Sequence, residues 1–250
     1  MASFTVSTHA LNAWAPIVNG DVHSVLAGTA VYLRGEFTLL NLINMRNRLA
    51  AFPPTTNTSQ AWNPNANGVV RAMALLGTSL FIGGDFTAVA GSARNHIALI
   101  NSAGTLNSWT KDLDGGVQCL VIANNTVFVG GEFTLVDGTA RRLAAFGVPG
   151  SGVPSTTDWT AAMEDTVLAI ASHGPSVFIG GHFLEGGGLS RRNIAALDFD
   201  TGQPLSWAPE IDGACTPWSR APWGRLCRWS VHSCGQCPSA EHRRHRPGHR

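Results

Sequence analysis

Ionisable side chains recur at one place in this 250-residue chain, and their types could bind a cation. An acid or a histidine stands immediately before four phenylalanines, at Glu36, Asp85, Glu132 and His182. If each structural unit placed one such group around a common axis, the clustered carboxylates would attract a cation.

An arginine also follows each of these phenylalanines by 8 or 9 residues, at Arg46, Arg94, Arg141 and Arg191. A carboxylate and a guanidinium that recur in phase predict, more simply, an ion pair within each unit. We favour this pairing over a cation ring. His182 departs from the pattern, either as a local specialisation or by drift.

Two sets of aromatic residues share one period along the chain. The phenylalanines are spaced 49, 47 and 50 residues apart, at Phe37, Phe86, Phe133 and Phe183. The tryptophans are spaced 48, 47, 50 and 48 residues apart, at Trp14, Trp62, Trp109, Trp159 and Trp207. Two landmarks in phase indicate a tandem repeat, and a period of this length is typical of solenoids and propellers.

Four complete units are predicted between the end of a truncated repeat (1–20) and a tail of different composition (214–250). The four units span 21–68, 69–116, 117–165 and 166–213. We number them 1 to 4.

The second unit shows the elements that must position these side chains. Apolar runs at 69–76, 80–82, 97–100 and 106–110 have the length of strands and are separated by turn residues. No helical period is visible, so each unit is expected to be a four-stranded antiparallel blade. The fold predicted is therefore an all-β propeller with four recognisable blades and an incomplete fifth, open at its 1–20 edge.

Glycines before the acidic position are expected to permit a bulge or a close approach of two backbones. They stand at Gly84, Gly131 and Gly181. The tryptophans are interpreted as packing residues in the core or between blades rather than as platforms for sugars, because burying a large aromatic ring is strongly stabilising.

Composition excludes some partners. The net charge is +1 and only 13% of residues are charged, so nucleic acid is not an expected partner. No apolar run approaches the roughly 20 residues that span a bilayer, and no signal peptide is visible at the start.

The repeated motifs carry a resemblance to a known family. Gly-Gly-Asp/Glu-Phe-Thr, followed by Arg-x-x-Ile/Leu-Ala and then Gly-x-x-x-x-Trp-x-Pro, resembles the delta-60 type repeat of bacterial β-propellers over residues 11–213. The resemblance implies a propeller scaffold of an exported or surface protein, but it indicates almost nothing about activity. Residues 196–207 are also similar to the blade motif of quinoprotein dehydrogenases.

The tail contains four of the five cysteines, at Cys215, Cys227, Cys234 and Cys237. A zinc site and a basic nucleic-acid arm are two interpretations. A third explains more, because other reading frames through these codons permit a fifth copy of the repeat. We therefore interpret 214–250 as an out-of-frame translation.

The function expected is a non-catalytic binding or scaffold module without a cofactor, whose protein or carbohydrate ligand lies on the blade loops. No nucleophile elbow, zinc-protease motif or phosphate loop is present. The alternative is a propeller enzyme, either a quinoprotein-like dehydrogenase or a glycoside hydrolase whose paired carboxylates come from different blades.

Overall fold

The computed structural model describes residues 15–53, 56, 61–148, 155–156, 159, 161–207 and 209. These residues form strands and turns without a helix, and every strand pair is antiparallel. The prediction of an all-β chain is confirmed. It follows that the part of the chain described here has no helix that could cross a membrane. Trp14 and the tail at 214–250 lie outside the described residues.

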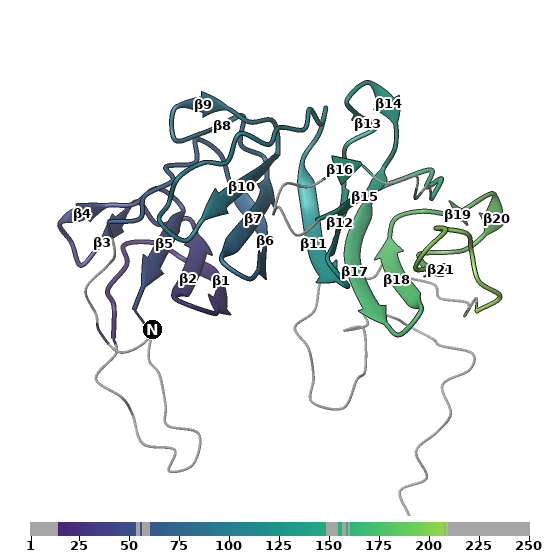
Figure 1. The fold of residues 1–250 in the computed structure, drawn as a ribbon, viewed down its shortest axis with the longest axis horizontal. Helices are drawn as coiled ribbons and strands as arrows, with labels where there is room; N and C mark the ends of the chain where they lie inside the picture. Colours follow the sequence, from purple (N-terminus) through teal and green to yellow (C-terminus); the bar gives the residue numbers. More distant parts are fainter. Residues whose placement is uncertain are drawn as a thin grey trace, which may run out of the picture.

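Each unit contributes one main sheet and one short hairpin (Figure 1). In units 1 and 2 the sheets are β1 (Val22–Ala27), β2 (Val31–Gly35) and β5 (Leu49–Phe52), then β6 (Val70–Leu76), β7 (Ser79–Gly84) and β10 (Ile97–Asn101). In units 3 and 4 they are β11 (Val117–Ala123), β12 (Thr126–Gly131), β15 (Leu143–Gly147) and β16 (Ser155–Thr156), then β17 (Val167–His173), β18 (Ser176–Gly181) and β21 (Ile194–Asp198).

The hairpins occupy the segments that follow the repeated phenylalanines. They are β3 (Leu39–Leu40) with β4 (Asn44–Met45), β8 (Ala88–Val89) with β9 (Ser92–Ala93), β13 (Leu135–Val136) with β14 (Thr139–Ala140), and β19 (Glu185–Gly186) with β20 (Leu189–Ser190). At the tip of the third hairpin, Asp137 and Gly138 both have positive φ, at 48° and 77°. Consecutive positive φ values at a two-residue tip are typical of a type I′ turn, for which Asp-Gly is a strong signal.

The first three predicted strands of unit 2 are present, but the fourth is not. Residues 106–110 were expected to pair along their length, and the structure gives one isolated bridge, between Ile100 and Leu106. The side chain of Asn107 accepts the backbone N–H of Trp109 at 2.8 Å. This local bond occupies a backbone donor that a longer strand ladder would use, since an asparagine side chain competes with the ladder for backbone donors.

Most of the hydrophobic core lies between neighbouring sheets, and one further cluster, around Phe37 and Phe52, lies within unit 1. Separate buried clusters join units 1 and 2, units 2 and 3, and units 3 and 4. The four repeated phenylalanines are fully buried. The four sheets follow one another across Figure 1 in chain order, with the short hairpins on the outer side of the row.

Three of the repeated tryptophans are buried in these clusters, one in each. Trp62 packs edge-on against Tyr32, with ring centroids 5.5 Å apart. Trp109 lies between Phe81 of unit 2 and Phe146 of unit 3. Trp159 donates from Nε1 to the carbonyl of Asp198 in unit 4 at 3.1 Å. Trp207, in contrast, is 44% exposed.

Candidate functional site

A β-bulge in the first strand of each sheet positions the repeated polar residues. In unit 2, Val70 pairs with Gly84 and Ala72 pairs with Gly83, so Arg71 is the extra residue. The same register shift occurs in the other three sheets, at His23, Gln118 and Leu168. A bulge re-aims a side chain. In units 1 to 3 the side chain of the bulge residue contacts the residue that precedes the repeated phenylalanine.

Glycine is required opposite each bulge because the two backbones approach closely. A Cβ added to Gly84 would lie 2.0 Å from the carbonyl oxygen of Val69, and the distances at Gly131 and Gly181 are 2.2 and 2.0 Å. The next N–H, that of Asp85, donates to the same Val69 carbonyl at 2.8 Å. The glycine expected from the sequence to permit a bulge therefore has this role in the structure.

The bulge residues, and not the downstream arginines, are the side-chain partners of the repeated carboxylates. His23 Nε2 lies 3.2 Å from Glu36 Oε1. Arg71 Nε donates to both carboxylate oxygens of Asp85, at 3.0 and 2.9 Å. Gln118 donates to Glu132 at 2.7 Å. The hydrogen bond to Asp85 raises the pKa of Arg71, an effect that partial burial reduces. In unit 4 the two positions are held by Leu168 and His182, a pair without a carboxylate.

The downstream arginines were predicted to pair with these acids, and the structure places them elsewhere. Arg94 donates to the carbonyl of Asn107 at 2.9 Å, and Arg191 donates to the carbonyl of Leu205 at 2.9 Å. Arg141 donates to the carbonyl of Trp159 at 3.0 Å. Arg46, Arg94 and Arg191 each also donate to the carbonyl of the preceding residue. In units 2 to 4 the arginine thus holds the segment that carries the repeated tryptophan.

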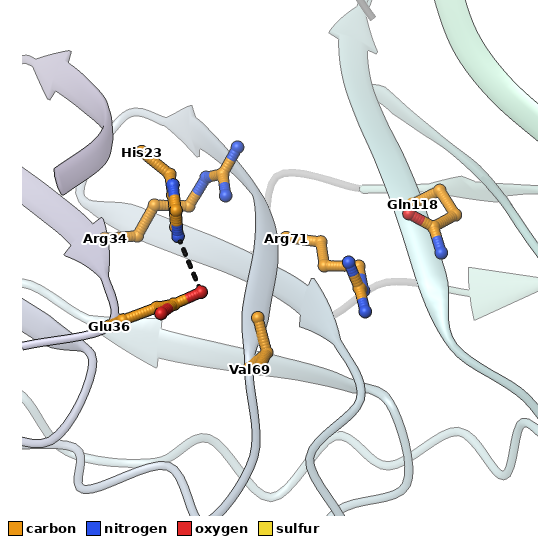
Figure 2. A pocket seen from close by; sticks show the side chains of 6 residues that line it. All are labelled: His23, Arg34, Glu36, Val69, Arg71 and Gln118. Atoms are coloured by element: carbon orange, nitrogen blue, oxygen red, sulfur yellow. Dashed lines mark hydrogen bonds and ion pairs between the residues drawn. The ribbon is translucent and has the colours of Figure 1, made fainter. Parts of the chain in front are cut away.

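One pocket brings several of these side chains together. It has a volume of about 350 Å³ and is lined by His23, Arg34, Glu36, Val69, Arg71 and Gln118. Its residues come from the first strands β1, β6 and β11, from β2, and from the ends next to β2 and β6. Figure 2 shows Arg71 extending from its strand toward the strand that carries Gln118, with His23 bonded to Glu36 on the other side. The pocket therefore spans three units.

Arg34 is the residue that distinguishes this pocket from the other unit borders. It occupies the position that is glycine in the other three units, at Gly83, Gly130 and Gly180. Its guanidinium crosses from unit 1 to unit 2 and donates to the carbonyl of Val70 at 3.0 Å. Burial lowers the pKa of Arg34, and the positive charge of Arg71 lowers it further. An anion in the pocket would offset both effects.

The four candidates for a cation ring do not gather at one point. Glu36 lines the pocket, while Asp85 and Glu132 are engaged with Arg71 and Gln118, and His182 is exposed in unit 4. Among the described residues, no three histidine, cysteine or acidic side chains are grouped so that they could hold a metal ion. The zinc site considered for the tail lies outside the described residues.

Sequence reasoning missed two parts of this site. The bulge residues precede their acidic partners by 13 or 14 positions, but they share no residue type, so a search by identity passes over them. Arg34 was visible as a departure from the Gly-Gly motif. That departure was the signal for a modified unit border.

The chain was compared with protein families, curated proteins and solved structures. No protein-family model matches the chain, and no curated protein matches it. Among solved structures, it is similar to the computationally designed Ika8 protein, at 17% identity over 80% of this chain and with a TM-score of 0.49. It is also similar to the computationally designed Ika4 protein, at 20% identity over 62% of this chain and 81% of that chain, with a TM-score of 0.41. The chain spans 53% of the Ika8 chain.

Proposed function

We propose that this chain is a non-catalytic binding module whose four units are the blades of a β-propeller. The resemblance of its motifs to the delta-60 type repeat supports this arrangement and supports a place in a larger exported or cell-surface protein. The ligand is a carbohydrate or a protein.

The observation that carries the proposal is the combination of a pocket with carboxylates that are already engaged. Glu36, Asp85 and Glu132 each interact with a side chain from the first strand of their own sheet. A glycoside hydrolase needs two carboxyl groups directed at one substrate bond. Here the repeated acids hold the bulges, and the pocket beside them is lined by polar side chains from three units. Its volume falls within the range of small-ligand sites, roughly 300–1,000 Å³, which favours a sugar over a flat protein contact.

Native gel electrophoresis of the full chain tests this function. Neutral and acidic polysaccharides, such as galactan, xylan and polygalacturonate, would each be cast into a gel, and reducing ends would be measured in matching solutions. We expect slower migration in at least one gel and no more reducing ends than heat-denatured protein releases. Release of reducing ends that falls in the Glu36→Gln or Asp85→Asn variant would establish an enzyme instead. Unchanged migration in every gel would contradict carbohydrate binding.

A further inference from the structure

We infer that the pocket lined by units 1 to 3 binds the carboxylate of a sugar acid, and that Arg34, at the border between units 1 and 2, is its anchor. The inference rests on the proposed function, since it names the ligand class of the same pocket. It is carried by one partly buried cation, Arg34, for which the described part of the chain provides no acidic partner.

Arg34 has donors to spare. Among the described residues, its guanidinium makes one side-chain hydrogen bond, to the carbonyl of Val70, and no ion pair. A guanidinium carries five N–H donors in a planar fork that matches a carboxylate. Arg71, the second cation of the pocket, is already engaged by Asp85. Arg34 is therefore the free cation within the described part of the pocket.

The side chain of Arg34 needs space between the sheets of units 1 and 2 that the next two unit borders do not have. At the equivalent positions of the next two borders, a Cβ on Gly83 would lie 2.4 Å from Val117, and a Cβ on Gly130 would lie 2.6 Å from Val167. Those borders are closed by direct packing of the glycine on a valine. In the first border the side chain of Arg34 stands between the sheets, and the pocket lies beside it. Arginine in place of the repeated glycine thus provides both the space of the pocket and its positive charge.

The other lining groups select the kind of anion. Gln118 uses its amide nitrogen on Glu132, which leaves its oxygen to accept from a ligand hydroxyl. Glu36 uses Oε1 on His23, which leaves Oε2 as a second acceptor. Acceptors beside a single free cation suit a monovalent acid that carries hydroxyl groups. Phosphate or sulfate would bring more negative charge next to Glu36 and fewer donors, so both are expected to bind less well.

Isothermal titration calorimetry of the full chain tests this inference with galacturonate as the probe. Galactose is its neutral counterpart, and inorganic phosphate is the competing anion. We expect galacturonate to bind at least about tenfold more tightly than either, because only the sugar acid has both a carboxylate for the fork and hydroxyls for the acceptors.

Two variants separate the anchor from the charge. Arg34→Gly restores the residue of the other units, so it is expected to fold, which circular dichroism would check. It should weaken galacturonate binding at least about tenfold, and Arg34→Lys should weaken it nearly as much, because lysine lacks the bidentate fork. Arg192→Gly removes an equal charge from an exposed arginine outside the pocket and serves as the matched control.

Several results would overturn the inference. They are galacturonate binding within twofold of wild type in Arg34→Gly, equal binding of galactose, tighter binding of phosphate, and no binding of galacturonate by the wild type. None of these would contradict the binding module itself if the chain is retarded in polysaccharide gels. Release of reducing ends, in contrast, would contradict the module and leave the pocket as a substrate site.

Discussion

Two borders between neighbouring units are built from equivalent strands but differ in how closely those strands pack. One lies between units 2 and 3, and the other lies between units 1 and 2. At the first of these, Gly83 lies directly against Val117, and β6 and β7 contact β11 extensively. At the second, Arg34 replaces the glycine, and β1 and β2 contact β6 only sparsely. A buried apolar cluster joins the two sheets at both borders. At the closed border, between units 2 and 3, the first strands also pack directly together, whereas at the other border Arg34 reaches across between the sheets. A repeat protein can therefore acquire a pocket by changing a single position of a packing motif.

The closed border should depend most on its tryptophan. Trp109 is buried between Phe81 and Phe146, with ring centroids 6.0 and 5.5 Å away, so it joins both sheets. Trp109→Ala should lower the free energy of unfolding by about 4 kcal/mol, since it removes a large buried side chain and leaves a cavity. Urea denaturation followed by circular dichroism would measure the loss.

The matched control for this change is Trp207→Ala. Trp207 is 44% exposed and has one edge-on contact with Phe178, at 5.3 Å. It should cost about 1 kcal/mol. Equal losses from the two substitutions would show that position in the repeat, and not burial between sheets, decides the contribution of the tryptophan.

Exchanging the residue that distinguishes the two borders should have unequal effects on stability. Gly83→Arg would force a Cβ to within 2.4 Å of Val117 in a border without space for it. We expect a loss of about 3 kcal/mol from overpacking. Arg34→Gly should change stability by less than about 1 kcal/mol, because one hydrogen bond to Val70 is lost and the cost of a buried charge is removed. Urea midpoints of both variants would measure the difference. Tolerance of arginine at both positions would mean that the borders are equally adaptable and that the pocket is not a consequence of Arg34.

The sequence was sufficient to predict the strands whose landmarks repeat, and this has a physical reason. The phenylalanines and the glycine pair mark places where every unit meets the same constraint, namely full burial and close backbone approach. A constraint of this kind fixes residue type, so it can be read from spacing. The fourth strand was overestimated, since the segment forms one bridge to the sheet and Asn107 accepts a backbone N–H locally, which a pattern of apolar residues does not reveal.

The side-chain partners could not be predicted for a different reason. Asp85 and Arg94 recur in phase, but their period reflects two separate roles, one at the bulge and one at the tryptophan segment. A bulge shifts the register by one residue, and this shift decides which side chain faces the acid. The register follows from backbone geometry, and Arg71 stands where no residue type recurs. In-phase spacing therefore showed which residues have a structural role, but it did not show which partner each residue has.

The smallest expected effect lies in the hairpin that docks at the closed border. Asp137 accepts the backbone N–H of Asp112 at 2.9 Å and pairs with Lys111. Partial burial tends to raise the pKa of Asp137, but these interactions outweigh it and hold the pKa below the ordinary value of 3.8. A carboxyl group whose pKa is lower in the folded state stabilises the fold above its unfolded-state pKa, and this contribution is lost as pH falls through the folded value.

Acid unfolding of Asp137→Asn would therefore isolate this contribution. Wild type should lose more stability than the variant as pH falls below about 4, and the difference should stay under about 1 kcal/mol because the pair is partly exposed to solvent. Urea midpoints measured between pH 6 and the acid limit of folding, at low and high salt, would show it. Asp200→Asn removes an equal charge from an exposed turn in unit 4 and is the matched control. A parallel fall of stability in wild type and Asp137→Asn would mean that the docking of this hairpin does not depend on the charge of Asp137. The closed border would then owe its stability to apolar packing alone, which would sharpen its contrast with the charged border of Arg34.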